Sequence, residues 1–189
     1  MLRELVTKNR SCRRFFQDYV IGTDILKELV DLARLSGSAG NMQSLRYILA
    51  GDPEKNDLIF QTLAWAAYLE DWPGPPEGER PSAYIVILDD KENSMSLGCD
   101  LGIAAQSIML GATEKGLQGC MIASIQREKL RELLTIPERY DILLILALGK
   151  PKEQVAIEPI DSSDSLKYWR DSEGVHHLPK RALDDIILG

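Results

Sequence analysis

The sequence has little basic charge, few cysteines and histidines, and no long apolar run. Its 189 residues contain 22 lysines and arginines against 29 aspartates and glutamates, for a formal net charge of -7 at pH 7. Nucleic-acid backbones demand a broad basic surface, so a chain with a pI near 4.9 is poorly suited to bind them. No apolar run approaches the ~18 residues of a membrane-spanning helix, and residues 1–14 are too polar for a secretory signal. We therefore expect a cytoplasmic protein with no membrane or nucleic-acid partner.

Three cysteines and two histidines leave little material for a thiol or metal site. Cys12, Cys99 and Cys120 match neither zinc-ligand spacing nor a C-x-x-C redox pair. We expect reduced, mostly buried thiols, and no histidine follows a cysteine in a motif that would indicate a catalytic thiol. His176 and His177 are adjacent, so on a strand they would face opposite sides. The sequence predicts no metal site.

The length and composition fit one domain over residues 1–189. The apolar fraction of 44% and the charged fraction of 27% are ordinary for a globular protein. The tail over residues 153–189 is polar, is broken by Pro159 and Pro179, and has too little apolar content for a domain of its own. Such a tail is expected to wrap over another surface, for which a partner subunit is one candidate.

Hydrophobic periodicity predicts a mixture of helices and strands. Helices are expected over residues 1–14, 25–35, 52–69, 100–115 and 128–134, and strands over 46–50, 83–88, 119–125 and 142–148. The run 83–88 is apolar throughout, which is typical of a strand buried on both faces. Thr23 or Asp24 is expected to cap one helix and Asp100 another, with Gly116 as the stop of the latter. The small residues of helix 100–115 favour close packing and deep burial.

Positive charge is densest at Arg10–Arg14, where three arginines occur in five residues. Guanidinium groups offer bidentate donors, and Ser11 adds a hydroxyl. Two phenylalanines follow directly, which places this charge against the body of the protein. A positive island on an acidic chain suits a small phosphorylated anion. The alternative, equally supported, is a solvated cluster that pairs with Glu4 or Asp18.

A loop of small residues over 36–44 precedes the expected strand 46–50. Its glycines would let the backbone approach a ligand closely. Asn41 and Gln43 supply both donors and acceptors, as the polar edge of a flat heterocycle requires. The alternative is a plain helix-to-strand connection, because many such loops are rich in Gly and Ser for turn chemistry alone.

Residues 72–81 contain four prolines and two glycines and cannot form regular structure. Trp65, Tyr68 and Trp72 precede or begin this excursion. These aromatic side chains either stack on a planar ligand or pack under the loop, and we favour packing. Residues 65–82 are expected to shape any pocket nearby.

Four stretches, each weak alone, occur in a specific order: Arg10–Phe15, then Ala39–Arg46, then Asp100–Gly102 continuing through Gly116–Cys120, and finally Leu148–Pro151 with Pro179–Arg181. In this order they resemble the nitroreductase family of flavoproteins over most of the chain. The resemblance implies an α+β fold with a central, mostly antiparallel sheet flanked by helices. It also implies an FMN-bound homodimer with two flavin sites at the interface and a C-terminal tail extended over the partner subunit.

By the same resemblance, two basic groups hold one end of the cofactor. Arg10, Ser11 and Arg13 are expected to contact the phosphate, the ribityl chain and the pyrimidine edge, and Lys180 and Arg181 to complete the phosphate site. A guanidinium near N1 and O2 would stabilise the reduced flavin, and Arg13 is the candidate.

The remaining expected contacts come from two other segments. The loop with Ser38, Asn41, Gln43 and Ser44 would reach the flavin of the partner subunit, and the backbone near flavin N5 would be that of Ile122, Ala123 and Ser124. The family often has Pro-Trp after the loop glutamine, whereas Ser44-Leu45 stands here. The middle excursion is also short, which predicts a more open pocket or one more dependent on the partner.

The resemblance implies an oxidoreductase that carries hydride from NAD(P)H to an electron-poor acceptor, such as a nitroaromatic or a quinone, by a ping-pong mechanism. No protein acid or base is strictly required, so no catalytic side chain is assigned. Three alternatives stay open: another flavin reaction on the same scaffold (dehalogenation or flavin breakdown), a flavin-binding protein without turnover, and an acidic α/β domain without flavin.

Overall fold

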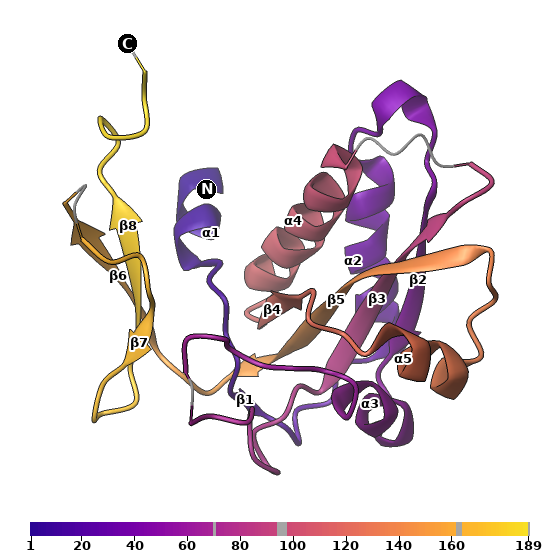
Figure 1. Ribbon diagram of the computed structural model, residues 1–189, viewed down its shortest axis with the longest axis horizontal. Helices are drawn as coiled ribbons and strands as arrows, with labels where there is room; N and C mark the ends of the chain where they lie inside the picture. The colour runs from indigo at the N-terminus through magenta and orange to yellow at the C-terminus, as the bar shows by residue number, and fades with distance from the viewer. Residues whose placement is uncertain (70, 94–97, 162–163, 189) are drawn as a thin grey trace.

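The centre of the fold is an antiparallel sheet, seen in a computed structural model that describes every residue except 70, 94–97, 162–163 and 189 (Figure 1). Its five strands in the described part of the chain are β1 (Phe15–Phe16), β2 (Leu45–Ala50), β3 (Ala83–Asp90), β4 (Gln118–Ile122) and β5 (Tyr140–Pro151). β5 pairs with β3 on one side and with β4 and β1 on the other, and β2 pairs with β3; all four pairings are antiparallel.

β3 occupies the middle of this sheet because its side chains are apolar on both faces. Ile85 and Ile87 belong to one hydrophobic cluster, and the alternating Tyr84, Val86 and Leu88 belong to the other, as the two-residue period of a strand requires. The prediction of a strand buried on both faces is confirmed. The mostly antiparallel sheet and the α+β class are confirmed with it.

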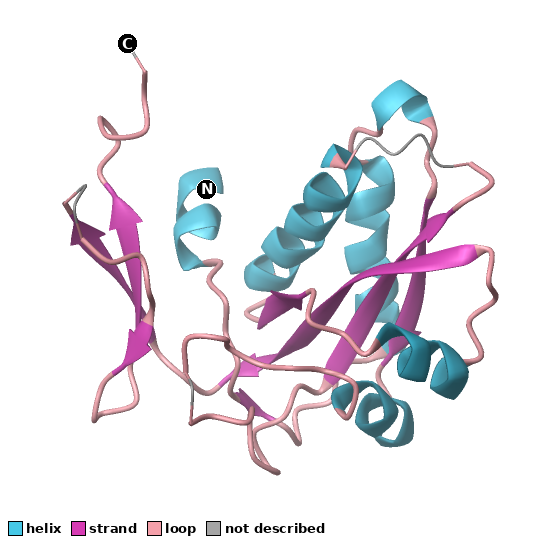
Figure 2. Ribbon diagram, in the orientation of Figure 1, coloured by secondary structure: helices cyan, strands magenta, loops and turns pink. Residues whose placement is uncertain are grey.

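Helices cover both faces of the sheet (Figure 2). α2 (Thr23–Leu35) and α4 (Cys99–Glu114) pack on one face, and α3 (Pro53–Phe60) and α5 (Arg127–Leu134) lie on the other. α4 has seven buried residues, the largest number for a helix in the described part, which confirms its expected burial. A Cβ at Gly111 would overlap with Leu32 Cδ1 of α2, so the small residue is what allows these two helices to approach closely.

Three local expectations are corrected. The helix expected over 52–69 ends at Phe60, because Ala64 N–H donates to Ser124 O at 3.0 Å and Ala66 adopts a left-handed φ of 40°. At the start of α2 the capping position is held by Gly22, and Thr23 is already helical. Likewise Gly98 precedes α4, and the Asp100 carboxylate lies in the first turn of the helix. Gly116, with a φ of 72°, does end α4.

The two ends of the chain lie together, apart from the helices that flank the sheet (Figure 1). α1 (Leu2–Lys8) stands between the main fold and a second sheet formed by β6 (Val155–Ile160), β7 (Trp169–Arg170) and β8 (His176–Arg181). β6 and β8 are parallel, and β7 pairs antiparallel with β8. The tail is therefore extended, but it carries regular strands that the sequence did not predict. No helix in the described ranges is long and apolar enough to cross a membrane.

Candidate functional site

The arginine-rich motif leaves α1 and runs along the start of β4. Ser11 forms an isolated parallel bridge with Gly119, and the Cys12 N–H donates to Gly119 O at 2.9 Å. A Cβ at Gly119 would overlap with Ala147 O of β5, so only glycine lets three chain segments approach here. The backbone of the predicted site is thereby fixed to the edge of the main sheet.

The Arg13 guanidinium points towards the tail. Its Nη1 lies 3.3 Å from His176 Nε2 on β8, and its Cζ lies 4.9 Å from the centroid of the Tyr168 ring. The backbone N–H of Arg13 donates to Glu153, whose fully buried carboxylate also pairs with Arg170 Nη2 at 2.8 Å. These contacts join the motif to the tail across more than 130 residues of sequence.

His176 has an unmet hydrogen-bonding group beside Arg13. Burial, together with the positive charge of Arg13, lowers the pKa of His176 to about 4, so its imidazole is neutral near pH 7. A guanidinium always donates, so Nε2 accepts from Arg13 and Nδ1 carries the proton. That Nδ1–H is buried and has no partner among the described residues. A buried donor without a partner calls for an acceptor, such as a ligand oxygen or an ordered water.

A second orphan donor lies at Arg10. A cavity of about 420 Å³ opens between α1, the start of β4 and β6, and is lined by Lys8, Arg10, Gln118 and Glu153 among others. Arg10 donates to Val6 O through Nη2, whereas its Nε is buried without a partner in the described part of the chain. Two cationic side chains and a free N–H at a cavity of this size suit a phosphate-bearing group.

Arg14, the third arginine of the motif, has a structural role. Its guanidinium pairs with Glu79, and Lys152 Nζ lies 2.9 Å from the same carboxylate. Hydrogen bonds from Arg14, followed by those from Lys152, lower the pKa of Glu79 to about 2. The ion-pair alternative therefore holds for Arg14, but with Glu79 as the partner in place of Glu4 or Asp18. Glu4 pairs with Lys8 at 2.7 Å.

The loop with Ser38, Asn41, Gln43 and Ser44 is clamped by Asp100. The carboxylate accepts from Ser38 Oγ at 2.6 Å and from Ala39 N–H at 3.0 Å, which lowers the pKa of Asp100. Ser38 Oγ in turn accepts from Gln43 N–H at 3.0 Å. The loop contains the 3₁₀ turn η1 (Ala39–Asn41), and Asn41 and Gln43 have left-handed φ values of 54° and 50°. It is thus a fixed feature that leaves both amide side chains exposed.

Sequence reasoning missed this function of Asp100. We expected it to cap its own helix, and the structure shows it holding a loop about 60 residues earlier in the chain. A loop hydroxyl and an acidic residue in the first turn of a later helix were the only signals, and neither identifies its partner.

The loop and the arginine motif lie at opposite ends of α4. The loop contacts Asp100 at the start of this helix, and the motif contacts Gly119 just beyond its end (Figure 1). The 16 residues of α4 span ~24 Å at 1.5 Å per residue. One chain therefore does not bring these two groups of predicted contacts together.

The other predicted contacts lie further along β4 and β8. Ile122 ends β4, and the exposed Ala123 and Ser124 follow it, ~13 to 17 Å along the chain from Gly119. Lys180 and Arg181 are exposed on β8, ~13 to 17 Å beyond His176. The structure therefore groups Arg10, Ser11 and Arg13, and it places the second basic pair on the strand that Arg13 contacts.

The aromatic side chains before the excursion pack against protein groups, as favoured from the sequence. The Trp65 ring lies 5.8 Å from that of Phe60, and a Cβ at Gly74 would come within 2.7 Å of Trp65. The Arg170 guanidinium lies over the Trp72 ring, and its Cζ is 4.9 Å from the ring centroid.

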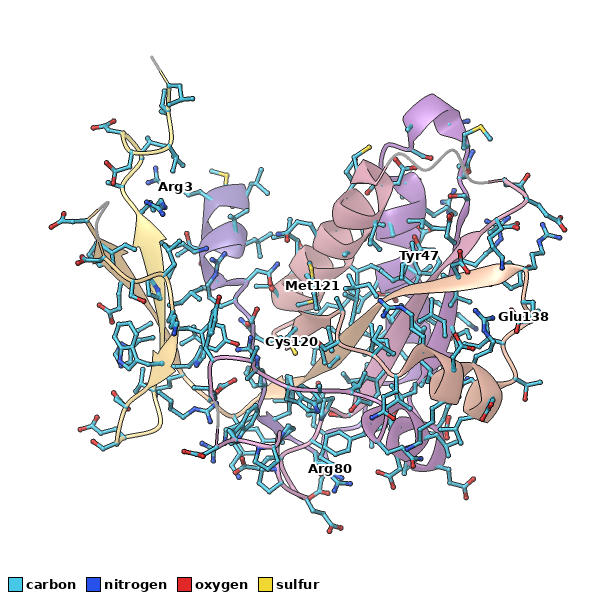
Figure 3. All side chains as sticks on the ribbon, in the orientation of Figure 1. Arg3, Tyr47, Arg80, Cys120, Met121 and Glu138 are labelled. Carbon is cyan, nitrogen blue, oxygen red and sulfur yellow. The ribbon has the colours of Figure 1, made fainter. Side chains whose placement is uncertain are left out.

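The two cysteines in or beside the arginine motif are buried thiols. Cys12 and Cys120 are buried (Figure 3 labels Cys120 within the fold), whereas Cys99 is exposed. Burial raises the pKa of Cys12 well above its usual range and that of Cys120 to about 12. Both thiols stay protonated at neutral pH. No group of three metal-ligating side chains occurs in the described part of the chain.

Comparisons with known proteins agree with this fold. A family model described as the nitroreductase family matches residues 6–150. A relative from Archaeoglobus fulgidus, named as an NADH dehydrogenase/NAD(P)H nitroreductase, is 26% identical and covers 75% of this chain and 80% of its own. The NADPH-flavin oxidoreductase of Vibrio harveyi is 24% identical over 82% of this chain and 68% of its own. The structure of an FMN-dependent nitroreductase from Clostridium difficile R20291 matches with a TM-score of 0.63 at 24% identity, over 79% of this chain and 87% of that one.

Proposed function

Because the chain belongs to the nitroreductase family, we propose that it is an FMN-dependent oxidoreductase that uses NAD(P)H. Relatives named as NADPH-flavin oxidoreductase and FMN reductase, and the FMN-dependent structural neighbour, support the cofactor and the electron donor. FMN, when bound, supplies two-electron chemistry that accepts hydride from NAD(P)H and passes electrons, in ping-pong order, to an acceptor such as a nitroaromatic or a quinone.

The observation that carries this proposal is the Arg13 guanidinium, which His176 Nε2 and the Tyr168 ring hold in place, together with the orphan Nε–H of Arg10. A guanidinium held in this way supplies donors for the acceptor oxygens and nitrogens along the pyrimidine edge of a flavin. We assign the phosphate to Arg10 and Lys8, which line the 420 Å³ cavity. His176 was not among the residues expected from the sequence, and we add it to the proposed contacts.

Arg13 has a second task in this proposal. Reduction of a flavin leaves negative charge on the pyrimidine portion, and a fixed guanidinium stabilises that charge. The Tyr168 ring and His176 restrict the guanidinium, so little reorganisation is needed when the charge develops. The chain thus contributes binding, orientation and a positive charge, and no side chain needs to transfer a proton.

We test the activity by the colour of the purified protein. It should show flavin absorbance bands, which should bleach on addition of NADH or NADPH under nitrogen and return on addition of a quinone or a nitroaromatic. A yellow protein that bleaches with neither nucleotide contradicts the oxidoreductase proposal. A protein that stays colourless after soaking with FMN contradicts the cofactor as well.

We further propose that the active form is a homodimer in which each site uses both chains. The distance of ~24 Å along α4 between the Ser38–Ser44 loop and the arginine motif supports this, because a loop from a second copy is then needed to complete each site. The exposed amide groups of Asn41 and Gln43 are held ready for such a contact.

Mixed dimers distinguish shared sites from sites within one chain. One tagged chain carries Arg13→Ala and the other carries Asn41→Ala with Gln43→Ala, and tandem purification isolates the heterodimer. If each site is shared, one of the two sites is intact, and the heterodimer should hold about half the flavin of the native dimer, whereas either mutant homodimer holds little. Equal loss in the heterodimer and both homodimers would show that the loop and the motif serve the same chain.

A further inference from the structure

A second cavity is lined in part by Gln17, Asp18 and Val20, which follow β1 in the chain. It has a volume of about 370 Å³ and is bounded by the connection from β1 to α2, by α3 and by the segment that enters β3. None of the twelve predicted cofactor contacts is among its described lining residues. Its size is at the low end for small-molecule sites, which excludes a dinucleotide such as NAD(P)H.

Four buried polar atoms of its lining residues have no partner in the described part of the chain: Asn56 Oδ1, Arg80 Nε, Ser82 Oγ and Tyr84 Oη. Ser82 is only 7% exposed and Tyr84 only 1%. Buried polar groups in folded proteins are nearly always hydrogen-bonded, so four orphans around one cavity call for an explanation. Half of the eight unpartnered side-chain atoms found in the described chain lie here.

These side chains are held in place by their other atoms. Asn56 Nδ2 donates to Ser82 O at 2.8 Å, which leaves Oδ1 as a free acceptor. Arg80 Nη1 lies 3.4 Å from Asp57 Oδ1, and its Cζ lies 4.3 Å from the centroid of the Phe60 ring. Figure 3 shows Arg80 at the lower edge of the molecule, on the side of α3. The free atoms are therefore fixed in position before any ligand arrives.

We propose that this cavity binds a small amino-carboxylate, that is, a free amino acid or a close analogue. Three of the orphan atoms are donors, the N–H of Arg80 and the hydroxyls of Ser82 and Tyr84, and together they match a carboxylate. The orphan acceptor of Asn56, with the carboxylate of Asp57 beside it, matches an ammonium group.

The remaining lining sets the size and charge of this ligand. Val20, Pro53 and Phe60 give an apolar wall that suits a short aliphatic side chain. Asp18 and Asp57 outnumber Arg80, so a dianion such as a phosphate ester would be repelled, whereas a zwitterion carries no net charge. L-Leucine satisfies each of these requirements and serves as the probe.

The test is calorimetric titration of the full-length, flavin-loaded protein. L-Leucine should bind with a Kd of about 1 mM or below. 4-Methylpentanoate, which lacks the ammonium group, and leucinamide, which lacks the carboxylate, should each bind at least about tenfold more weakly. If titration with L-leucine gives no binding heat, or if the three compounds bind equally, the proposal is wrong and the cavity holds only water.

Variants decide whether binding occurs in this cavity. Tyr84→Phe removes one orphan hydroxyl and should weaken L-leucine binding about tenfold. Because that hydroxyl has no partner, the variant should fold and melt at a temperature no lower than the native protein. Tyr47→Phe makes the same change on β2, outside the cavity, and should leave the affinity unchanged. Equal affinity for L-leucine in the native protein and Tyr84→Phe overturns the site.

Discussion

Replacing Arg13 with alanine should weaken FMN retention about 10- to 100-fold, the effect of losing hydrogen bonds to a charged group. The same change should lower the reduction potential of the bound flavin, because a guanidinium stabilises the negative charge that reduction produces. The Glu153 carboxylate keeps both partners, the backbone N–H of residue 13 and Arg170, so the fold around the site should survive.

Flavin-to-protein ratio after gel filtration and spectroelectrochemical titration of the remaining holoprotein measure these two effects. Arg34→Ala provides a matched control, since it removes an exposed guanidinium that pairs with Asp31, three residues earlier in α2. Unchanged flavin content and potential in Arg13→Ala would remove this residue from the proposed site. A loss of flavin without a change of potential would leave it a binding role alone.

Among substitutions that add a single methyl group, Gly119→Ala is expected to cause the largest loss of stability. The added Cβ would overlap with the backbone oxygen of Ala147 and lie 2.9 Å from Leu148 Cδ2. A backbone oxygen within the β4–β5 pairing cannot move aside without breaking that pairing, so the free energy of unfolding should fall by about 3 kcal/mol or more. Flavin retention should fall together with stability, because Gly119 accepts the hydrogen bond from the Cys12 N–H and forms the bridge with Ser11.

Urea unfolding compares the stabilities of the Gly119→Ala and Gly102→Ala variants. A Cβ at Gly102 of α4 would meet nothing within 4 Å, and alanine should stabilise the helix by up to about 1 kcal/mol. Similar urea midpoints for the two variants would contradict the steric argument, since only one of these glycines has a backbone atom in the way.

The features that could be predicted from the sequence are those that depend on residues close together in the chain. The apolar run of β3, the small residues of α4 and the stop at Gly116 all have local signatures, and the structure reproduces them. The arginine motif was also visible, because its charge is concentrated in five residues. The contact of Ser11 and Cys12 with Gly119 was not, since nothing in a sequence marks which glycine a distant strand will approach.

The missed features are those fixed by distant partners. α3 was predicted too long because residues 61–69 have helical composition, yet Ala64 bonds to Ser124 instead of to its own preceding turn. His176 looked like half of a poor metal pair until the fold placed it against Arg13. Pro159 and Pro179 suggested an irregular tail, and both lie within paired strands.

The burial of Cys12 and Cys120 has a consequence for the quinone reduction proposed above. Quinones are electrophiles that arylate thiolates, and an enzyme that turns them over meets them at high local concentration. Arylation needs a deprotonated, accessible sulfur, and the two cysteines nearest Arg13 offer neither. If the acceptor is a quinone, as proposed, the part of the site built by the arginine motif therefore presents no thiolate for it to arylate.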